Sequence, residues 1–154
     1  AVHPRTPWAA EELDRWPDYA APTPNREEQV YFHRVKAGAD GWAEAALLHP
    51  DFGLAFQWDT RTAPYLTQWK NTRQNIYVCG VEPGNCIPEG REGARRSGRL
   101  ALLEGGASQG FGLRIECLPD AAAVEACRRR IDGLASQGQI VTGCNYADYE
   151  TKGA

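Results

Sequence analysis

The sequence has 154 residues, the size of one domain, and its 17 basic and 20 acidic residues give a formal net charge of −3. No dense basic stripe is present, so we expect no nucleic-acid partner. The sequence also contains no run of eighteen or more apolar residues, the length that a helix needs to cross a membrane. Residues 1–24 also lack the pattern of a signal peptide, which favours a cytoplasmic protein.

The five cysteines and three histidines are scattered and lack the paired spacing of a metal site. Free thiols in a reducing compartment are the simplest interpretation, and a disulfide between Cys79 and Cys86 is the alternative. Methionine is absent, even at position 1, which predicts a processed or partial chain; removal of an initiator methionine before Ala1 is the alternative.

Residues 1–26 are predicted to form a Pro/Trp-rich arm, because each of its prolines favours an extended conformation in the residue before it. A short helix is expected over residues 9–16, with Glu11 and Glu12 in its first turns. Trp8 and Trp16 are expected to pack on a neighbouring surface. A linker to another part of the protein is the alternative.

Alternating apolar and polar residues predict a β-rich domain over residues 27–118. The expected strands cover 28–35, 42–48, 54–58, 66–70, 76–81, 100–103 and 111–118. Turn signals separate these strands at intervals of about ten residues, which is typical of an antiparallel, mainly β sandwich or barrel. In the last strand, Arg114 and Glu116 are expected on an exposed face.

Two segments outside these strands complete the prediction. Residues 85–98 are expected to form a loop, either simply solvated or placing Arg91 over a ligand's carboxylate, phosphate or hydroxyl. Residues 119–154 are expected to form a helix and a polar tail. Asp120 suits the N-cap, and the helix is expected to run to Ile131 or Leu134.

A candidate site surrounds Glu82, which is expected where the strand over residues 76–81 gives way to the Pro83-Gly84 turn. Its sequence neighbours combine aromatic faces with polar groups, the mixture that a sugar needs. These neighbours are Gln68, Trp69, Lys70, Tyr77 and Asn85. The alternatives are a core role for Trp69 and Tyr77 and a surface charge for Glu82.

Three motifs carry a family resemblance: Thr67-Gln68-Trp69-Lys70, Glu82-Pro83-Gly84-Asn85-Cys86 and Gly90-Arg91. On these residues, the segment 28–103 resembles the aldose 1-epimerase (galactose mutarotase-like) superfamily. The closest likeness is to its branch of uncharacterised epimerase-like proteins with a TQWK…EPGNC…GR pattern. The resemblance implies the C-terminal part of a galactose mutarotase-like supersandwich.

The resemblance also implies roles for individual residues. Glu82 would be the general base that takes the proton from the anomeric hydroxyl, and no metal or cofactor would be required. Gln68, Trp69, Lys70, Tyr77, Asn85, Arg91 and His33 would contact the sugar. The family's sugar-binding aspartate is replaced by Phe32, and no histidine matches the family's general acid.

The sequence therefore predicts an aldose 1-epimerase-like isomerase with a sugar ligand. One alternative is a non-catalytic carbohydrate-binding β-sandwich module, and another is a purely structural β-domain. A partial sandwich would expose strand edges and an apolar face, so a homo-oligomer or a partner chain that completes the fold is expected.

Overall fold

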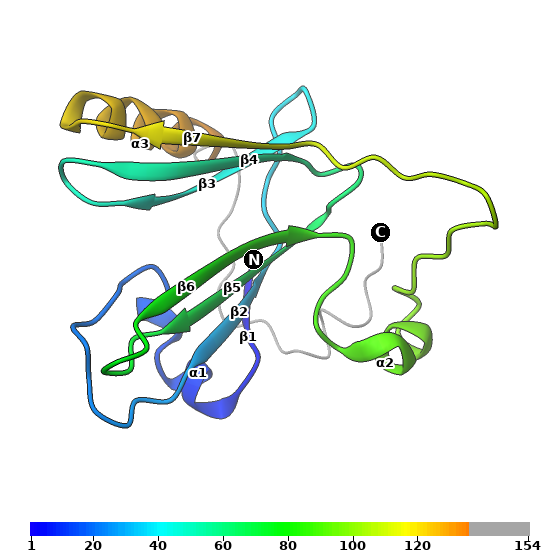
Figure 1. Ribbon diagram of the computed structural model, residues 1–154, viewed down its shortest axis with the longest axis horizontal. Helices are drawn as coiled ribbons and strands as arrows, with labels where there is room; N and C mark the ends of the chain where they lie inside the picture. Colours follow the sequence, from blue (N-terminus) through cyan, green and yellow to red (C-terminus); the bar gives the residue numbers. More distant parts are fainter. Residues whose placement is uncertain (136–154) are drawn as a thin grey trace. The chain divides into compact units, whose positions relative to one another are not determined.

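The computed structural model describes residues 1–135, which are mainly antiparallel β with a C-terminal helix, as predicted (Figure 1). The described residues divide into two compact units. The first unit contains residues 1–34 and 65–102, and the second contains residues 35–64 and 103–135. The sequence-based boundaries at residues 26 and 118 stay a prediction.

The first unit is built on a four-stranded antiparallel sheet in the order β1-β2-β5-β6. Its strands are β1 (Val2–Pro4), β2 (Gln29–His33), β5 (Tyr65–Asn71) and β6 (Val78–Gly84). Three short helices accompany the sheet: α1 (Pro7–Glu11), the 3-10 helix η1 (Leu13–Arg15) and α2 (Gly90–Arg96).

The two faces of this sheet are covered by different parts of the chain. On one face, Tyr31 is buried in a cluster with Val2 and Ala9, against which Leu13 and Trp16 pack. These contacts bring the segment from α1 to Trp16 onto that face, which we call the arm face. The opposite face carries a second cluster, in which Val30, Phe32 and Ile87 are buried and Tyr65 and Trp69 are partly buried.

The second unit is a three-stranded antiparallel sheet in the order β3-β4-β7 with one helix. Its elements are β3 (Trp42–Leu48), β4 (Gly53–Asp59), β7 (Leu113–Leu118) and α3 (Ala121–Ala135). The predicted N-cap is confirmed, since Asp120 Oδ1 accepts a 2.8 Å hydrogen bond from the Ala123 amide. Buried Val124 and Cys127 of α3 pack with Ala55 and Leu118 of the sheet.

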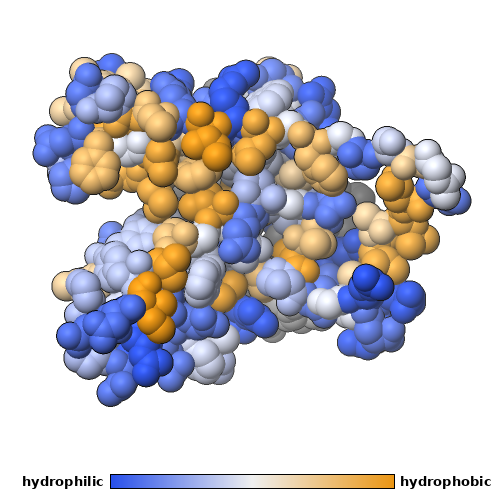
Figure 2. Space-filling view, in the orientation of Figure 1, coloured by the Kyte–Doolittle hydropathy of each residue, from blue (hydrophilic) through white to orange (hydrophobic). Residues whose placement is uncertain are grey.

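The face of this sheet that points away from α3 is apolar. Leu54, Leu113 and Ile115 share that face and are exposed. Figure 2 shows apolar side chains gathered on the second unit. Arg114 and Glu116 point to the helix side of the sheet. Arg114 is exposed there, as expected, while Glu116 is partly buried and pairs with Arg130 of α3 at 2.7 Å.

Several predicted elements need correction. Residues 85–98 are not simply a loop, because they contain α2. Residues 100–103 form no strand, and the expected helix over 9–16 is instead the shorter pair α1 and η1. The arm is not wholly irregular, because β1 pairs with β2. The predicted tail lies outside the described residues.

Within residues 1–135, no helix is long and apolar enough to cross a membrane. Cys79, Cys86, Cys117 and Cys127 are free thiols.

Candidate functional site

Glu82 lies inside β6 and not at its end, because the strand continues through Pro83 and Gly84. Its partner in the ladder is Thr67 of β5, which pairs in turn with Phe32 of β2 and so places Glu82 on the face opposite the arm. The Glu82 side chain is exposed. Because the strand is hydrogen-bonded to its neighbour, the backbone that carries this carboxylate is held in place, as a ligand-binding group requires.

Trp69 shares this face with Glu82. It lies two residues after Thr67 on β5 and directly opposite Gly80 of β6. The indole is partly buried against the Val30–Phe32–Ile87 cluster, and its Nε1–H donates a 2.8 Å hydrogen bond to Glu28 Oε2. One aromatic side chain and one carboxylate are therefore presented together on neighbouring strands.

His33, Gln68 and Lys70 lie on the arm face. Gln68 and Lys70 alternate with Thr67 and Trp69 along β5, and successive side chains of a strand point to opposite faces. All three side chains are buried. The three predicted sugar contacts are thus separated by the sheet from Glu82 and Trp69.

Lys70 holds the arm through hydrogen bonds to backbone carbonyls. Among the described residues, none of its hydrogen bonds is to a carboxylate. Its Nζ donates to the backbone carbonyls of Arg15, Trp16 and Asp18 at 3.2, 3.2 and 2.6 Å. These carbonyls lie at the C-terminal end of η1 and just after it, where a cation stabilises the unpaired carbonyl groups of a helix. Burial lowers the pKa of the Lys70 ammonium.

A chain of hydrogen bonds connects His33 to the arm through Gln68. His33 Nε2 donates to Gln68 Oε1 at 3.1 Å, and Gln68 Nε2 donates to Tyr19 Oη at 3.0 Å. Tyr19 Oη lies 2.7 Å from Cys79 Sγ. Burial lowers the pKa of His33 to about 4 and raises the pKa of both Tyr19 and the Cys79 thiol. These groups are neutral near pH 7, which suits a buried structural network.

The remaining predicted residues are dispersed around the first unit. Tyr77 precedes β6, is exposed, and donates from its hydroxyl to the Ala20 carbonyl at 2.9 Å. Asn85 follows β6 and is partly buried, and Arg91 is exposed on α2. No group of three or more His, Cys, Asp or Glu in residues 1–135 is arranged to hold a metal ion.

Comparison with known proteins identifies the family. The family model described as "Domain of unknown function (DUF4432)" matches residues 1–117. The chain belongs to this family. A search of curated proteins finds no match.

A solved structure is similar to the DUF4432 chain over most of its length. It is the crystal structure of a protein described as a putative aldose 1-epimerase from Klebsiella pneumoniae subsp. pneumoniae MGH 78578. The sequence identity is 33% and the TM-score is 0.84, over 90% of this chain. The match covers 36% of that protein, so this chain spans about a third of its length.

The DUF4432 chain also contains a buried ion pair that the sequence analysis missed. Arg99 donates from Nε and Nη2 to the two carboxylate oxygens of Glu89 at 2.7 and 2.6 Å. Their side chains are 3% and 7% exposed, and Ser97 adds hydroxyl contacts to the same carboxylate. The hydrogen bonds from Arg99 lower the pKa of Glu89. The pair brackets α2, and its spacing of ten residues gave no recognisable signal.

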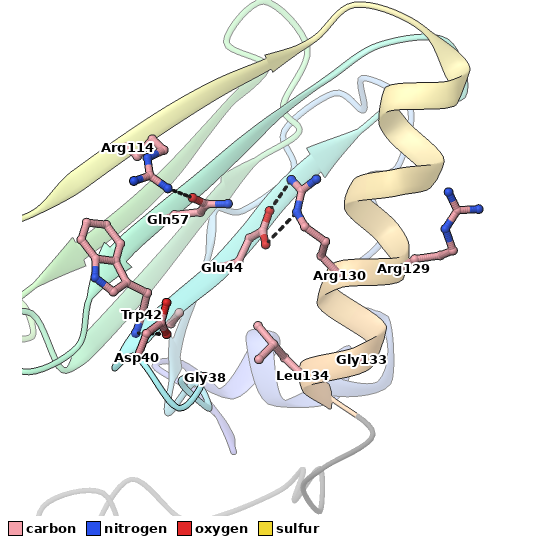
Figure 3. A pocket seen from close by; sticks show the side chains of 11 residues that line it. Gly38, Asp40, Trp42, Glu44, Gln57, Arg114, Arg129, Arg130, Gly133 and Leu134 are labelled. Atoms are coloured by element: carbon pink, nitrogen blue, oxygen red, sulfur yellow. Dashed lines mark hydrogen bonds and ion pairs between the residues drawn. The ribbon is translucent and has the colours of Figure 1, made fainter.

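A pocket of about 570 Å³ lies within the second unit, between the helix-side face of the sheet and α3 (Figure 3). Its charged groups are largely bound to one another. Arg130 contacts Glu44 at 2.8 Å, and Arg114 donates to Gln57 at 2.9 Å while lying over the Trp42 ring. The pocket was not predicted, since its residues are spread from position 38 to position 134.

Proposed function

We propose that this chain is the base-carrying part of an aldose 1-epimerase-like protein that interconverts the anomers of a sugar. The observation that carries the proposal is the 33% identity and TM-score of 0.84 to a protein described as a putative aldose 1-epimerase. The exposed Glu82 and the partly buried Trp69 on one sheet face support it, because they offer a proton acceptor beside a flat apolar surface.

The reaction requires two proton transfers at one carbon centre. Glu82 takes the proton from the C1 hydroxyl, the bond between C1 and the ring oxygen breaks, and an acid protonates that oxygen. The open-chain aldehyde rotates about the C1–C2 bond. Ring closure by the reverse transfers then gives the other anomer and restores both groups, so atoms and protons balance.

Within the first unit, neither His3 nor His33 can serve as the acid beside Glu82, and His33 lies on the arm face. The two reacting oxygens are attached to the same carbon, so base and acid must each reach within about 3 Å of them. His3 shares the face and ladder row of Glu82 but lies three strands away, a separation of roughly 14 Å at the usual strand spacing. Because this chain covers 36% of the similar protein, we propose that the acid comes from polypeptide beyond this chain.

Anomer exchange measured by NMR tests the proposal. Wild type and Glu82→Gln are compared over neutral, acidic and phosphorylated aldoses, with imidazole buffer as an external acid. We expect exchange above the spontaneous and buffer-catalysed rate with wild type only. An equal rate with Glu82→Gln would refute the role of Glu82 as base.

The absence of a histidine beside Glu82 among the described residues of the first unit favours one other function, a carbohydrate-binding module. In that case Glu82 only accepts a hydrogen bond from a hydroxyl. Saturable sugar binding without acceleration, even with imidazole present, and with most of the affinity kept in Glu82→Gln, would support the module and reject the epimerase.

A further inference from the structure

Gly80 occupies a position on β6 that leaves no room for a side chain. It precedes Glu82 by two residues and therefore lies on the same sheet face. A methyl group at position 80 would lie 2.3 Å from Glu82 Oε1 and 3.2 Å from its Cδ. The carboxylate of Glu82 thus fills the space that any other residue at position 80 would need.

The backbone does not explain a glycine at this point. Gly80 sits in a regular antiparallel ladder opposite Trp69, and its φ is not in the left-handed region. A glycine inside a strand weakens it and often marks a close approach by another group. Here the approaching group is the carboxylate two residues further along the same strand.

This arrangement directs Glu82 toward Trp69. Directly opposite side-chain positions in an antiparallel pair are about 5 Å apart, and position 80 faces Trp69. Because the Glu82 side chain folds back over Gly80, its carboxylate lies in the row of the indole and not only in the row of Thr67. The proton acceptor and the aromatic surface then share one ligand-sized region.

We propose that Gly80 is a positioning residue: by lacking a side chain, it holds the Glu82 carboxylate against the sheet beside Trp69. This inference rests on the proposed role of Glu82 as the base. The atom displaced by a methyl group is the end of a flexible exposed side chain, so the fold tolerates Gly80→Ala while the carboxylate moves. Misplacing a catalytic group by about 1 Å can cost 100-fold in rate.

Gly84→Ala is the matched control, because it makes the same change on the same strand and face. A methyl group at position 84 would meet only backbone atoms of Cys86, at 3.5 and 3.9 Å, which are ordinary contacts. We expect Gly80→Ala to lower kcat for anomer exchange by 10- to 100-fold, with the free energy of unfolding unchanged or slightly higher. Gly84→Ala should keep the wild-type rate.

Two further measurements separate positioning from a general structural effect. In the Glu82→Gln background, Gly80→Ala should cause no additional loss of rate, because it acts through the carboxylate. The carboxyl ¹³C signal of Glu82, identified by its absence in Glu82→Gln, should shift in Gly80→Ala and stay in place in Gly84→Ala. An unchanged signal or an unchanged kcat in Gly80→Ala would overturn the proposal.

The exchange rates of wild type, Glu82→Gln and Gly80→Ala keep the two proposals distinguishable. If wild type does not accelerate exchange, the proposed function fails and Gly80 loses its catalytic meaning, whatever the signal does. If wild type is active and Glu82→Gln is not, but Gly80→Ala retains the wild-type rate, the base assignment stands and only the positioning role is wrong.

Discussion

The buried His33 makes the stability of the first unit depend on pH. Its side chain lies on the arm face, 5% exposed, with the Trp16 ring edge-on at 4.8 Å and the Gln68 amide as hydrogen-bond partner. Burial, aided by the charges of the N-terminus and His3, lowers its pKa from 6.5 to about 4. Below pH 6.5 the unfolded chain therefore binds a proton that the folded chain does not.

The expected size of this effect follows from linkage. Each unit of difference in pKa corresponds to about 1.4 kcal/mol, so the shift costs at most about 3.4 kcal/mol at low pH. Between pH 7.5 and 5.0 the same two values give a loss of about 2 kcal/mol. The contribution of His33 to the stability of the folded chain is fully present above its unfolded pKa near 6.5. It is lost as the pH falls toward the folded pKa of about 4.

Urea unfolding of wild type and His33→Gln at both pH values measures this loss, since glutamine does not titrate. The difference in unfolding free energy between the two proteins should fall by about 2 kcal/mol from pH 7.5 to 5.0. His49→Gln is the control, because His49 is exposed on the turn between β3 and β4. If the difference in unfolding free energy between wild type and His33→Gln changed by less than about 0.5 kcal/mol between the two pH values, His33 would not be buried in solution. A change of that size is the usual effect of a surface substitution.

Three further predictions concern the first unit. Arg99→Met should lower the free energy of unfolding by about 3–5 kcal/mol, because it leaves the Glu89 carboxylate buried without its ion-pair partner. The double change Arg99→Met with Glu89→Leu should lower it by less, and urea unfolding measures both. Lys70→Met should lower the midpoint of urea unfolding and speed proteolysis of the arm, because three carbonyls lose their donor, and equal digestion rates would contradict this. Trp69→Ala should weaken sugar binding by roughly 5- to 50-fold through the loss of the apolar face, whereas Trp42→Ala in the second unit should bind as wild type in the same titration.

Elements with strong local periodicity could be predicted from the sequence. The bounds of β3 were predicted to the residue, and α3 was found from its N-cap residue, Asp120. Each of these patterns is visible within a short window, so no knowledge of tertiary contacts is needed.

The missed elements depend on distant contacts. The three residues of β1 form a strand only because they pair with β2, about thirty positions away. Helix α2 has two glycines in its seven residues, and its Ala94 is buried while the Glu89–Arg99 pair spans it. The false strand over residues 100–103 has no neighbour to pair with, and its Leu102 is 82% exposed.

The candidate site was predicted as one group because its residues are close in sequence, yet a strand separates sequence neighbours. Thr67 and Trp69 face Glu82, while Gln68 and Lys70 face the arm. This division follows from the two-residue period of a strand and could have been drawn from the sequence alone. The sequence predicted the arm but not the face of the sheet on which it packs. There its carbonyls and the Tyr19 hydroxyl accept hydrogen bonds from Lys70 and Gln68, which makes both side chains structural groups.

The motif Thr67-Gln68-Trp69-Lys70 therefore combines a structural role with a proposed ligand-binding role, and substitutions can separate the two. Changes at Gln68 or Lys70 remove hydrogen bonds to the arm and should lower stability, with any loss of sugar binding following from the loss of folded protein. Changes at Trp69 remove an outward aromatic surface and should lower sugar affinity while the fold persists. Residues that face the arm and residues that face Glu82 alternate along β5. Alanine substitution of each residue of this strand, with stability and sugar affinity both measured, therefore distinguishes a ligand site from a core more sharply than any single variant.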